Sequence, residues 1–156
     1  MIITFASEKL VFAKWGFPLN SVAHPEQYAC QKAGFFDGDM TYEEAERQFR
    51  KYLPDGLKTP GHHIMHILNN ESVVGNIWFE IRSRNVREAY LWDIIIFKEY
   101  RGKGYGRQSM NELESFVKKE GVKQISLNVF PYNTVARNLY QTSGYKEAAI
   151  TMLKYL

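Results

Sequence analysis

The sequence predicts an α/β domain with a mixed β-sheet. From residue 64 onward, segments rich in β-branched and aromatic residues alternate with segments of helical periodicity, in the order β-β-β-α-β-α-β. Turn-forming residues separate these segments, as in the "NNES" of residues 69–72. The chain has 156 residues, of which 45% are hydrophobic, and this suits a single domain with its own core.

The overall composition argues against several classes of protein. The formal net charge of +3 is far from the strongly basic balance of a nucleic-acid-binding domain. The longest apolar run, residues 94–97, is much too short to cross a membrane, and the N-terminus has no signal-peptide pattern. The one cysteine, Cys30, permits no internal disulfide and fits a reducing compartment. We therefore expect a cytoplasmic protein.

The first 60 residues are expected to be mainly helical and irregular. Thr41 and Glu44 have the spacing of a capping box, and apolar residues follow them at helical intervals. The "LPDG" sequence of residues 53–56 supplies a proline and a glycine that would end this helix.

Three strands are expected next. Residues 64–68 ("IMHIL") and 73–81 ("VVGNIWFEI") flank a turn composition, so they predict a hairpin. Residues 87–97 ("REAYLWDIIIF") predict the third strand. Its centre, residues 94–96, is apolar without alternation, as expected of a strand that is covered on both faces.

Two helices and two further strands complete the predicted order. A helix of about 15 residues begins near Gly106 with its apolar residues on one stripe, and Gly121 is placed to end it. Residues 123–130 predict a strand with alternating apolar residues. Residues 133–144 predict a short helix, and residues 145–156 predict a closing strand.

The junction between the third strand and the following helix combines glycines with basic residues. Glycines let the backbone approach an anion closely, and the start of a helix presents unpaired N–H groups with partial positive charge. Arginine and lysine side chains add charge that binds phosphate oxygens. The pattern predicts a cradle for a di- or polyphosphate, and its alternative is a glycine-rich turn with basic residues on the surface. The residues concerned are Arg101, Gly102, Lys103, Gly104, Gly106 and Arg107.

Two familiar glycine motifs do not fit this junction, because a Walker loop and a dinucleotide fingerprint both require a different glycine spacing. The pattern Arg101-x-x-Gly104-x-Gly106 instead resembles the pyrophosphate-binding motif of the GNAT superfamily of acetyl-CoA-dependent N-acetyltransferases. The sequence "NTVARNLYQTSGY" from Asn133 onward resembles the second signature of that family. The resemblance covers residues 64–156, and "TPGHH" before "VVGNIW" is similar to a poorly characterised bacterial subgroup.

This resemblance implies a single GNAT domain over residues 1–156, with a mainly helical acceptor-side part at 1–60 and an acetyl-CoA-binding core at 64–156. It implies a twisted, mostly antiparallel sheet flanked by helices, in which a central pair of parallel strands, "LWDIIIF" and "ISLNVF", splays after a bulge to hold CoA. Asn133 would bind the pantetheine end, cap its helix, or do both. The implied cofactor-binding residues are Ile94, Ile95, Ile96, Arg101, Gly102, Lys103, Gly104, Tyr105, Gly106, Arg107 and Asn133.

The resemblance also implies direct transfer of an acetyl group to a primary amine in a ternary complex. Tyr140 matches the tyrosine that commonly protonates the departing thiolate in this family, and it lies two helical turns after Asn133, on the same face. The alternative is that Tyr140 is a tyrosine of the core without a catalytic role. Glu80 and Asp93 are the candidate bases, since a symmetric hairpin would point both side chains to one sheet face. The alternative for either carboxylate is a salt bridge to a nearby arginine, Arg82, Arg84 or Arg87.

Three histidines, His62, His63 and His66, stand near the start of the first strand, and no carboxylate or cysteine nearby completes a ligand set. No metal is therefore expected, and a substrate-pocket role and a packing role stay open. The alternative to an enzyme is a non-catalytic acyl-CoA-binding module with the same cradle. We expect a small-molecule or peptide amine as the acceptor and neither a nucleic acid nor a membrane as a partner. The terminal "ITMLKYL" leaves a homodimer open.

Overall fold

The structure is a computed structural model that describes residues 50–70, 72–152 and 154–156. Helical residues 50–52 end before Leu53, where "LPDG" predicts the end of a helix, and the rest of the predicted N-terminal helical part lies outside the described residues. The elements that follow are η1 (Gly56–Lys58), β1 (His62–Asn69), β2 (Ser72–Ser83), β3 (Arg87–Ile96), η2 (Lys98–Tyr100), α4 (Tyr105–Lys119), β4 (Gln124–Leu127) and α5 (Thr134–Thr142).

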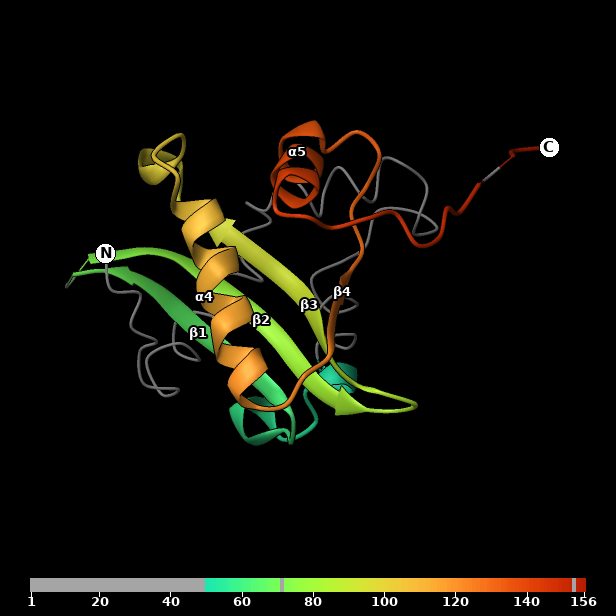
Figure 1. The fold of residues 1–156 in the computed structure, drawn as a ribbon, viewed down its shortest axis with the longest axis horizontal. Helices are drawn as coiled ribbons and strands as arrows, with labels where there is room; N and C mark the ends of the chain where they lie inside the picture. The colour runs from blue at the N-terminus through green and yellow to red at the C-terminus, as the bar shows by residue number, and fades with distance from the viewer. Residues whose placement is uncertain (1–49, 71, 153) are drawn as a thin grey trace.

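The strands form one sheet in the order β1-β2-β3-β4 (Figure 1). β1 pairs with β2, and β2 with β3, in antiparallel fashion, so the hairpin predicted from the sequence is present. β3 and β4 are parallel, because α4 carries the chain back across the sheet between them. The mixed, mostly antiparallel sheet of the prediction is therefore confirmed.

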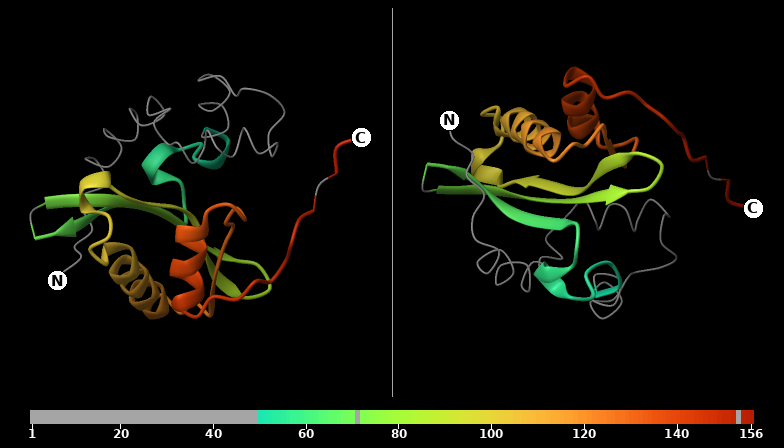
Figure 2. Two further views of the ribbon diagram at one scale, coloured as in Figure 1. Left: turned by 90° about the horizontal axis from the view of Figure 1, so that it is seen from above. Right: turned by 60° about the horizontal axis from the view of Figure 1, so that its bottom comes forward.

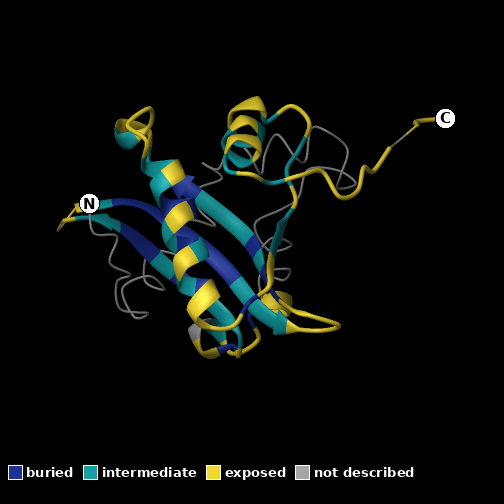
Figure 3. Ribbon diagram, viewed as in Figure 1, coloured by how far each residue is buried: buried dark blue, intermediate teal, exposed yellow. Residues whose placement is uncertain are grey.

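Helix α4 lies across one face of the sheet, and α5 lies on the same side (Figure 2). Met110, Leu113 and Val117 of α4 are buried, as the predicted apolar stripe requires, and they form the main core with the strands beneath (Figure 3). The strand residues of that core are Ile67, Val74, Ile77, Phe79, Ala89 and Leu91.

The opposite face of the sheet carries a second, smaller apolar cluster. Leu53, Ile64 and Trp78 are buried there, and Trp92 packs against them. The turn of residues 53–60 lies on this side of the sheet, away from α4 (Figure 2). The two faces therefore differ in character, since one packs on a helix and the other presents aromatic side chains.

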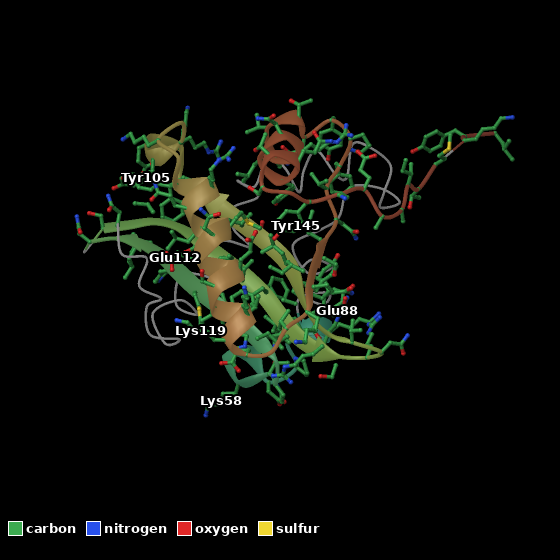
Figure 4. The ribbon with its side chains drawn as sticks, viewed as in Figure 1. Lys58, Glu88, Tyr105, Glu112, Lys119 and Tyr145 are labelled. Atoms are coloured by element: carbon green, nitrogen blue, oxygen red, sulfur yellow. The ribbon has the colours of Figure 1, made fainter. Side chains whose placement is uncertain are left out.

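A buried carboxylate, Glu88, ties three strands together at one end of the sheet (Figure 4). It accepts hydrogen bonds from Arg82 Nε of β2 at 2.7 Å and from Gln124 Nε2 of β4 at 2.9 Å, and Ser126 Oγ lies at 3.5 Å. The hydrogen bonds from Gln124 and Arg82, with the charge of Arg82, lower the pKa of Glu88. This network fixes the end at which the parallel strands are still paired.

Two predictions for the C-terminal half need correction. β4 ends at Leu127 and not near residue 130, because the chain turns away from β3 there. The closing strand predicted for residues 145–156 is wrong, since the described residues of this segment form no strand and its last residues extend away from the body (Figure 1). Ile150 and Met152 are 76% and 89% exposed. Strand propensity alone does not make a strand, because a strand needs a neighbour for its backbone hydrogen bonds.

No helix in the described part of the chain is long and apolar enough to cross a membrane.

Candidate active site

The glycine loop leads from the end of β3 into α4. Gly102 and Gly104 have positive φ angles of 73° and 83°, and Gly104 occupies the N-cap position of α4 without any side-chain cap. A β-carbon built on Gly102 would meet no atom within 4 Å, and one built on Gly104 would meet only the Gln108 side chain at 3.6 Å. The loop therefore curls around open space, which left-handed glycines permit.

The backbone amides of this loop are available to a ligand. Among the described residues, the amides of residues 102–107 donate to no backbone carbonyl, whereas the Arg101 amide donates to the Lys98 carbonyl at 3.3 Å. The first amides of α4 carry the partial positive charge of the helix N-terminus. A row of unpaired N–H groups beside open space has the donor set that a pyrophosphate requires.

Side chains hold the loop in place and add positive charge to it. Arg101 Nε donates to the Ile96 carbonyl at 2.9 Å, and the hydroxyl of Tyr105 accepts from Asn69 Nδ2 at 2.7 Å. Lys103 Nζ lies 5.5 Å from the centre of the Tyr100 ring. The Tyr105 hydroxyl is thus engaged with β1, and the cofactor-binding role predicted for this residue would fall to its backbone. The sequence does not predict the hydrogen bond between Asn69 and Tyr105, because these two residues are far apart in the chain.

β3 and β4 separate beside this loop. Their parallel pairing ends at Leu91 and Leu127, although β3 itself continues to Ile96. The separation begins at a bulge in β3, where Trp92 is the extra residue between the pairs Phe79–Leu91 and Trp78–Asp93. Beyond the bulge, the outer edge of β3 has no neighbouring strand among the described residues. We call this stretch, where β3 and β4 are no longer paired, the opening between β3 and β4. The splayed strand pair of the prediction is present.

The bulge could have been inferred from one residue of the sequence. In a regular strand, Asp93 would share the face of Leu91 and point its carboxylate into the core under α4. The extra residue instead puts Ile94 and Ile96 against that core and moves Asp93 to the other face. A charged residue at a core position within an apolar strand is the signal of this irregularity.

Helix α5 borders the opening from the side of α4. Asn133 is its N-cap, and its side-chain oxygen accepts from the Ala136 amide at 3.1 Å, so the predicted capping role is present. Tyr140 is half-buried against the main core, with its ring centre 5.8 Å from that of Tyr145. A β-carbon on Gly106 would lie 3.3 Å from Leu139, so the start of α4 and α5 pack closely.

The two candidate bases share the sheet face opposite α4, as predicted. Glu80 is paired with Tyr90 across the strands, and Asp93 is paired with Trp78, two residues before Glu80 on β2. The bulge, rather than hairpin symmetry, produces this arrangement. Tyr140 packs on the α4 side of the sheet, and the two carboxylates lie on the other side.

Glu80 already has three neighbours. Trp92 Nε1 donates to Glu80 Oε2 at 3.3 Å, and Arg82 Nη1 lies 3.7 Å from the same oxygen. His62 Nε2 lies 3.9 Å away. The predicted alternative of a salt bridge to Arg82 is therefore present for Glu80, whose side chain stays 20% exposed.

The three histidines have different surroundings. His62 is on the Glu80 face, and its Nδ1 accepts from Trp78 Nε1 at 3.0 Å. His66 is buried and shares a 2.7 Å hydrogen bond with Asn76, while His63 stacks on the Phe79 ring at 4.8 Å. A packing role therefore fits His63 and His66. Within the described residues, no three His, Cys, Asp or Glu side chains gather as a metal site.

The comparison with known proteins agrees with this geometry. Residues 26–145 match the acetyltransferase (GNAT) family. This match spans most of the chain, and the protein therefore belongs to the GNAT family of N-acetyltransferases. Membership implies the use of acetyl-CoA.

Individual relatives of the chain are likewise named as acetyltransferases. The chain is 35% identical over 127 residues to the uncharacterized N-acetyltransferase YycN of Bacillus subtilis (strain 168), covering 80% of this chain and 81% of that protein. The crystal structure of B. subtilis YycN matches with a TM-score of 0.85 at 29% identity and covers 99% of this chain and 98% of that one. A ribosomal protein bS18-alanine N-acetyltransferase of Haemophilus influenzae is 31% identical over 86 residues, covering 55% of this chain and 56% of that protein.

Proposed function

We propose that this protein transfers the acetyl group of acetyl-CoA to a primary amine by direct attack within a ternary complex. The observation that carries the proposal is the row of unpaired amides at residues 102–107, which borders the opening between β3 and β4. These amides would hold the pyrophosphate, with the exposed basic side chains of Arg101, Lys103 and Arg107 around them. The free edge of β3 would hold the pantetheine arm, and the thioester supplies an activated acetyl group.

The chain's own residues would accept and donate the protons of the reaction. An alkyl ammonium has a pKa of about 10.4, so a base must remove a proton before the nitrogen can attack. Glu80 or Asp93 would accept that proton on the sheet face opposite α4. The nitrogen then bonds to the carbonyl carbon as the carbon–sulfur bond breaks. Tyr140 would donate its hydroxyl proton to the thiolate. The new amide nitrogen would lose its second proton, and the tyrosinate would regain a proton through solvent.

The acceptor is expected to enter from the aromatic face. The relative from Haemophilus influenzae bears a name that specifies a protein alanine as its acceptor. A peptide that begins with alanine is therefore a reasonable first acceptor, beside polyamines, aminoglycosides, amino acids and lysine-containing proteins.

A thiol-release assay of the purified protein with acetyl-CoA and this panel tests the proposal. We expect thiol release that requires one class of amine, with a mass increase of one acetyl group on the acceptor. Thiol release that is equal with and without every amine, with no acetylated product, would refute it.

A non-catalytic acyl-CoA-binding module is the second candidate, because Glu80 is already engaged with Arg82 and Trp92. Tight CoA binding together with no turnover of any amine would favour this second function.

A further inference from the structure

Two indole N–H groups point at an imidazole–carboxylate pair on the face opposite α4. Trp78 Nε1 donates to His62 Nδ1 at 3.0 Å, and Trp92 Nε1 donates to Glu80 Oε2 at 3.3 Å. The two indole rings are stacked, with centres 5.2 Å apart and planes at 18°. Each member of the pair therefore has a donor-only group directed at it, from two rings that hold each other in place.

The donor from Trp78 determines the protonation state of His62. Since an indole only donates, His62 Nδ1 must carry a lone pair, and the ring proton of the neutral imidazole is on Nε2. A charged imidazole would place a second N–H against the indole N–H. The His62 side chain is only 8% exposed, and this burial lowers its pKa, although the Glu80 charge partly opposes the shift.

Among the charged groups on this face, Glu80 is the carboxylate that lies next to His62. Arg82 lies 3.7 Å from Glu80, but its Nε is bonded to Glu88 at 2.7 Å and its guanidinium covers the Tyr90 ring at 4.6 Å. The other titratable groups on this face, among the described residues, include Asp93, Tyr90 and Glu88 of β3, His66 of β1 and Tyr52 before η1.

A charged His62 would compete for Glu80. At 3.9 Å, an imidazolium would form an ion pair with this carboxylate and occupy the position that an ammonium group needs. A neutral His62 forms no such pair. It presents only a weakly polar N–H toward Glu80.

We propose that Trp78 and His62 are positioning residues: the Trp78 indole holds His62 in its uncharged form, and this keeps the Glu80 carboxylate available to the ammonium group of the acceptor. This inference rests on the proposed function and assigns the acceptor-binding role to Glu80. Once bound, the ammonium group would give one proton to the carboxylate, and the electron pair of the broken N–H bond would remain on the nitrogen as the lone pair that attacks.

The kinetic test compares the wild type with Trp78→Phe, His62→Asn and the double variant, using an alanine-initiated peptide as the acceptor. Phenylalanine keeps a ring but removes the N–H donor, so His62 becomes easier to protonate. We expect the KM for the peptide in Trp78→Phe, relative to wild type, to rise about threefold between pH 8 and pH 6. Asparagine accepts from Trp78 but never becomes charged, so we expect no such rise in His62→Asn or in the double variant.

The pH dependence separates positioning from a purely structural role. A structural defect in Trp78→Phe would raise KM equally at both pH values, and His62→Asn would not correct it. Either result would overturn the inference and leave the proposed function intact. Titration of the amine itself affects all four proteins alike and cancels in the comparison.

A second measurement does not depend on turnover or on a variant that folds. Nitrogen-15 NMR of the wild-type histidines at pH 7.5 is expected to show His62 neutral with its proton on Nε2. A charged ring, or a proton on Nδ1, would overturn the inference. If no amine is acetylated while this tautomer is found, the proposed function fails and the imidazole geometry stands.

Discussion

At the residue scale, Gly104 matters both for the backbone and for the proposed ligand. It has a positive φ of 83°, and it faces the open side of the loop. Replacing it with valine would place a branched side chain in front of the amides of residues 102–107. We expect CoA affinity to fall by roughly 100-fold, since two or more charge-assisted hydrogen bonds would be lost. Isothermal calorimetry with CoA measures the change.

Gly121 provides a matched control for backbone strain. It has a positive φ of 74°, meets no atom within 4 Å of its β-carbon position, and lies beyond the far end of α4. Gly121→Val should cost a similar stability, roughly 1–2 kcal/mol, yet bind CoA like the wild type. Equal loss of CoA affinity in both variants would mean that strain, and not occlusion of the amides, weakens binding.

The proposed reaction gives the hydroxyl groups of Tyr140 and Tyr145 different roles. Tyr140→Phe should lower turnover by roughly 100-fold, because the departing thiolate loses its acid, while CoA affinity stays unchanged. The Tyr145 hydroxyl is buried, and this burial, together with the nearby charge of Glu114, raises its pKa well above the ordinary value. This hydroxyl has no proposed role in the chemistry, so Tyr145→Phe should keep the turnover of the wild type. Similar turnover losses in the two variants would remove Tyr140 from the chemistry.

At the scale of elements, Glu88 links β2, β3 and β4. Glu88→Gln should lower the free energy of unfolding by about 2 kcal/mol at pH 7, because Arg82 would lose the closer of its two carboxylate partners. The pKa of Glu88 is lowered in the fold, so the carboxylate stabilises the protein above its ordinary pKa of 4.5 and loses this effect as the pH falls below it. Urea unfolding at pH 7 and pH 3.5 should show the difference between variant and wild type shrinking at the lower pH. A constant difference would exclude the charge as its cause.

Asn133 combines a structural role in α5 with the predicted role in pantetheine binding. Asn133→Ala should cost about 1 kcal/mol through the lost cap, and Asn133→Ser should restore most of that stability. If Asn133 also binds the pantetheine, both variants should weaken CoA binding, although serine keeps the cap. Normal CoA binding in the serine variant would limit Asn133 to capping. Thermal unfolding and calorimetry together separate the two roles.

The elements themselves were largely predictable, and the irregularities between them were less so. The spacing of apolar residues gave the bounds of α4, and glycines and Asn133 marked the ends of both helices. The side chains around Glu80 could not be derived in the same way, because the contacts to His62 and Trp92 join three strands. Such contacts depend on cross-strand register, which the bulge at Trp92 shifts by one residue.

At the scale of the whole molecule, the two faces of the sheet would have different roles in the proposed reaction. One face packs on α4 and α5, which would bring the glycine loop of residues 101–107 and Tyr140 to the opening between β3 and β4. The other face would present the acceptor to Glu80. The closing strand failed as a prediction because pairing is a property of the assembled sheet and not of a local segment. The homodimer that its sequence left open stays a prediction, and size-exclusion chromatography with light scattering would test it.

The central claim is that CoA binds to the open amides of residues 102–107 and along the free edge of β3. Titration of the nitrogen-15-labelled protein with CoA, followed through its backbone amide signals, tests this claim most directly. We predict that the largest shifts fall on Gly102, Gly104 and Gly106, with further shifts at residues 93–96. Unchanged signals, or shifts confined to other parts of the chain, would contradict the account.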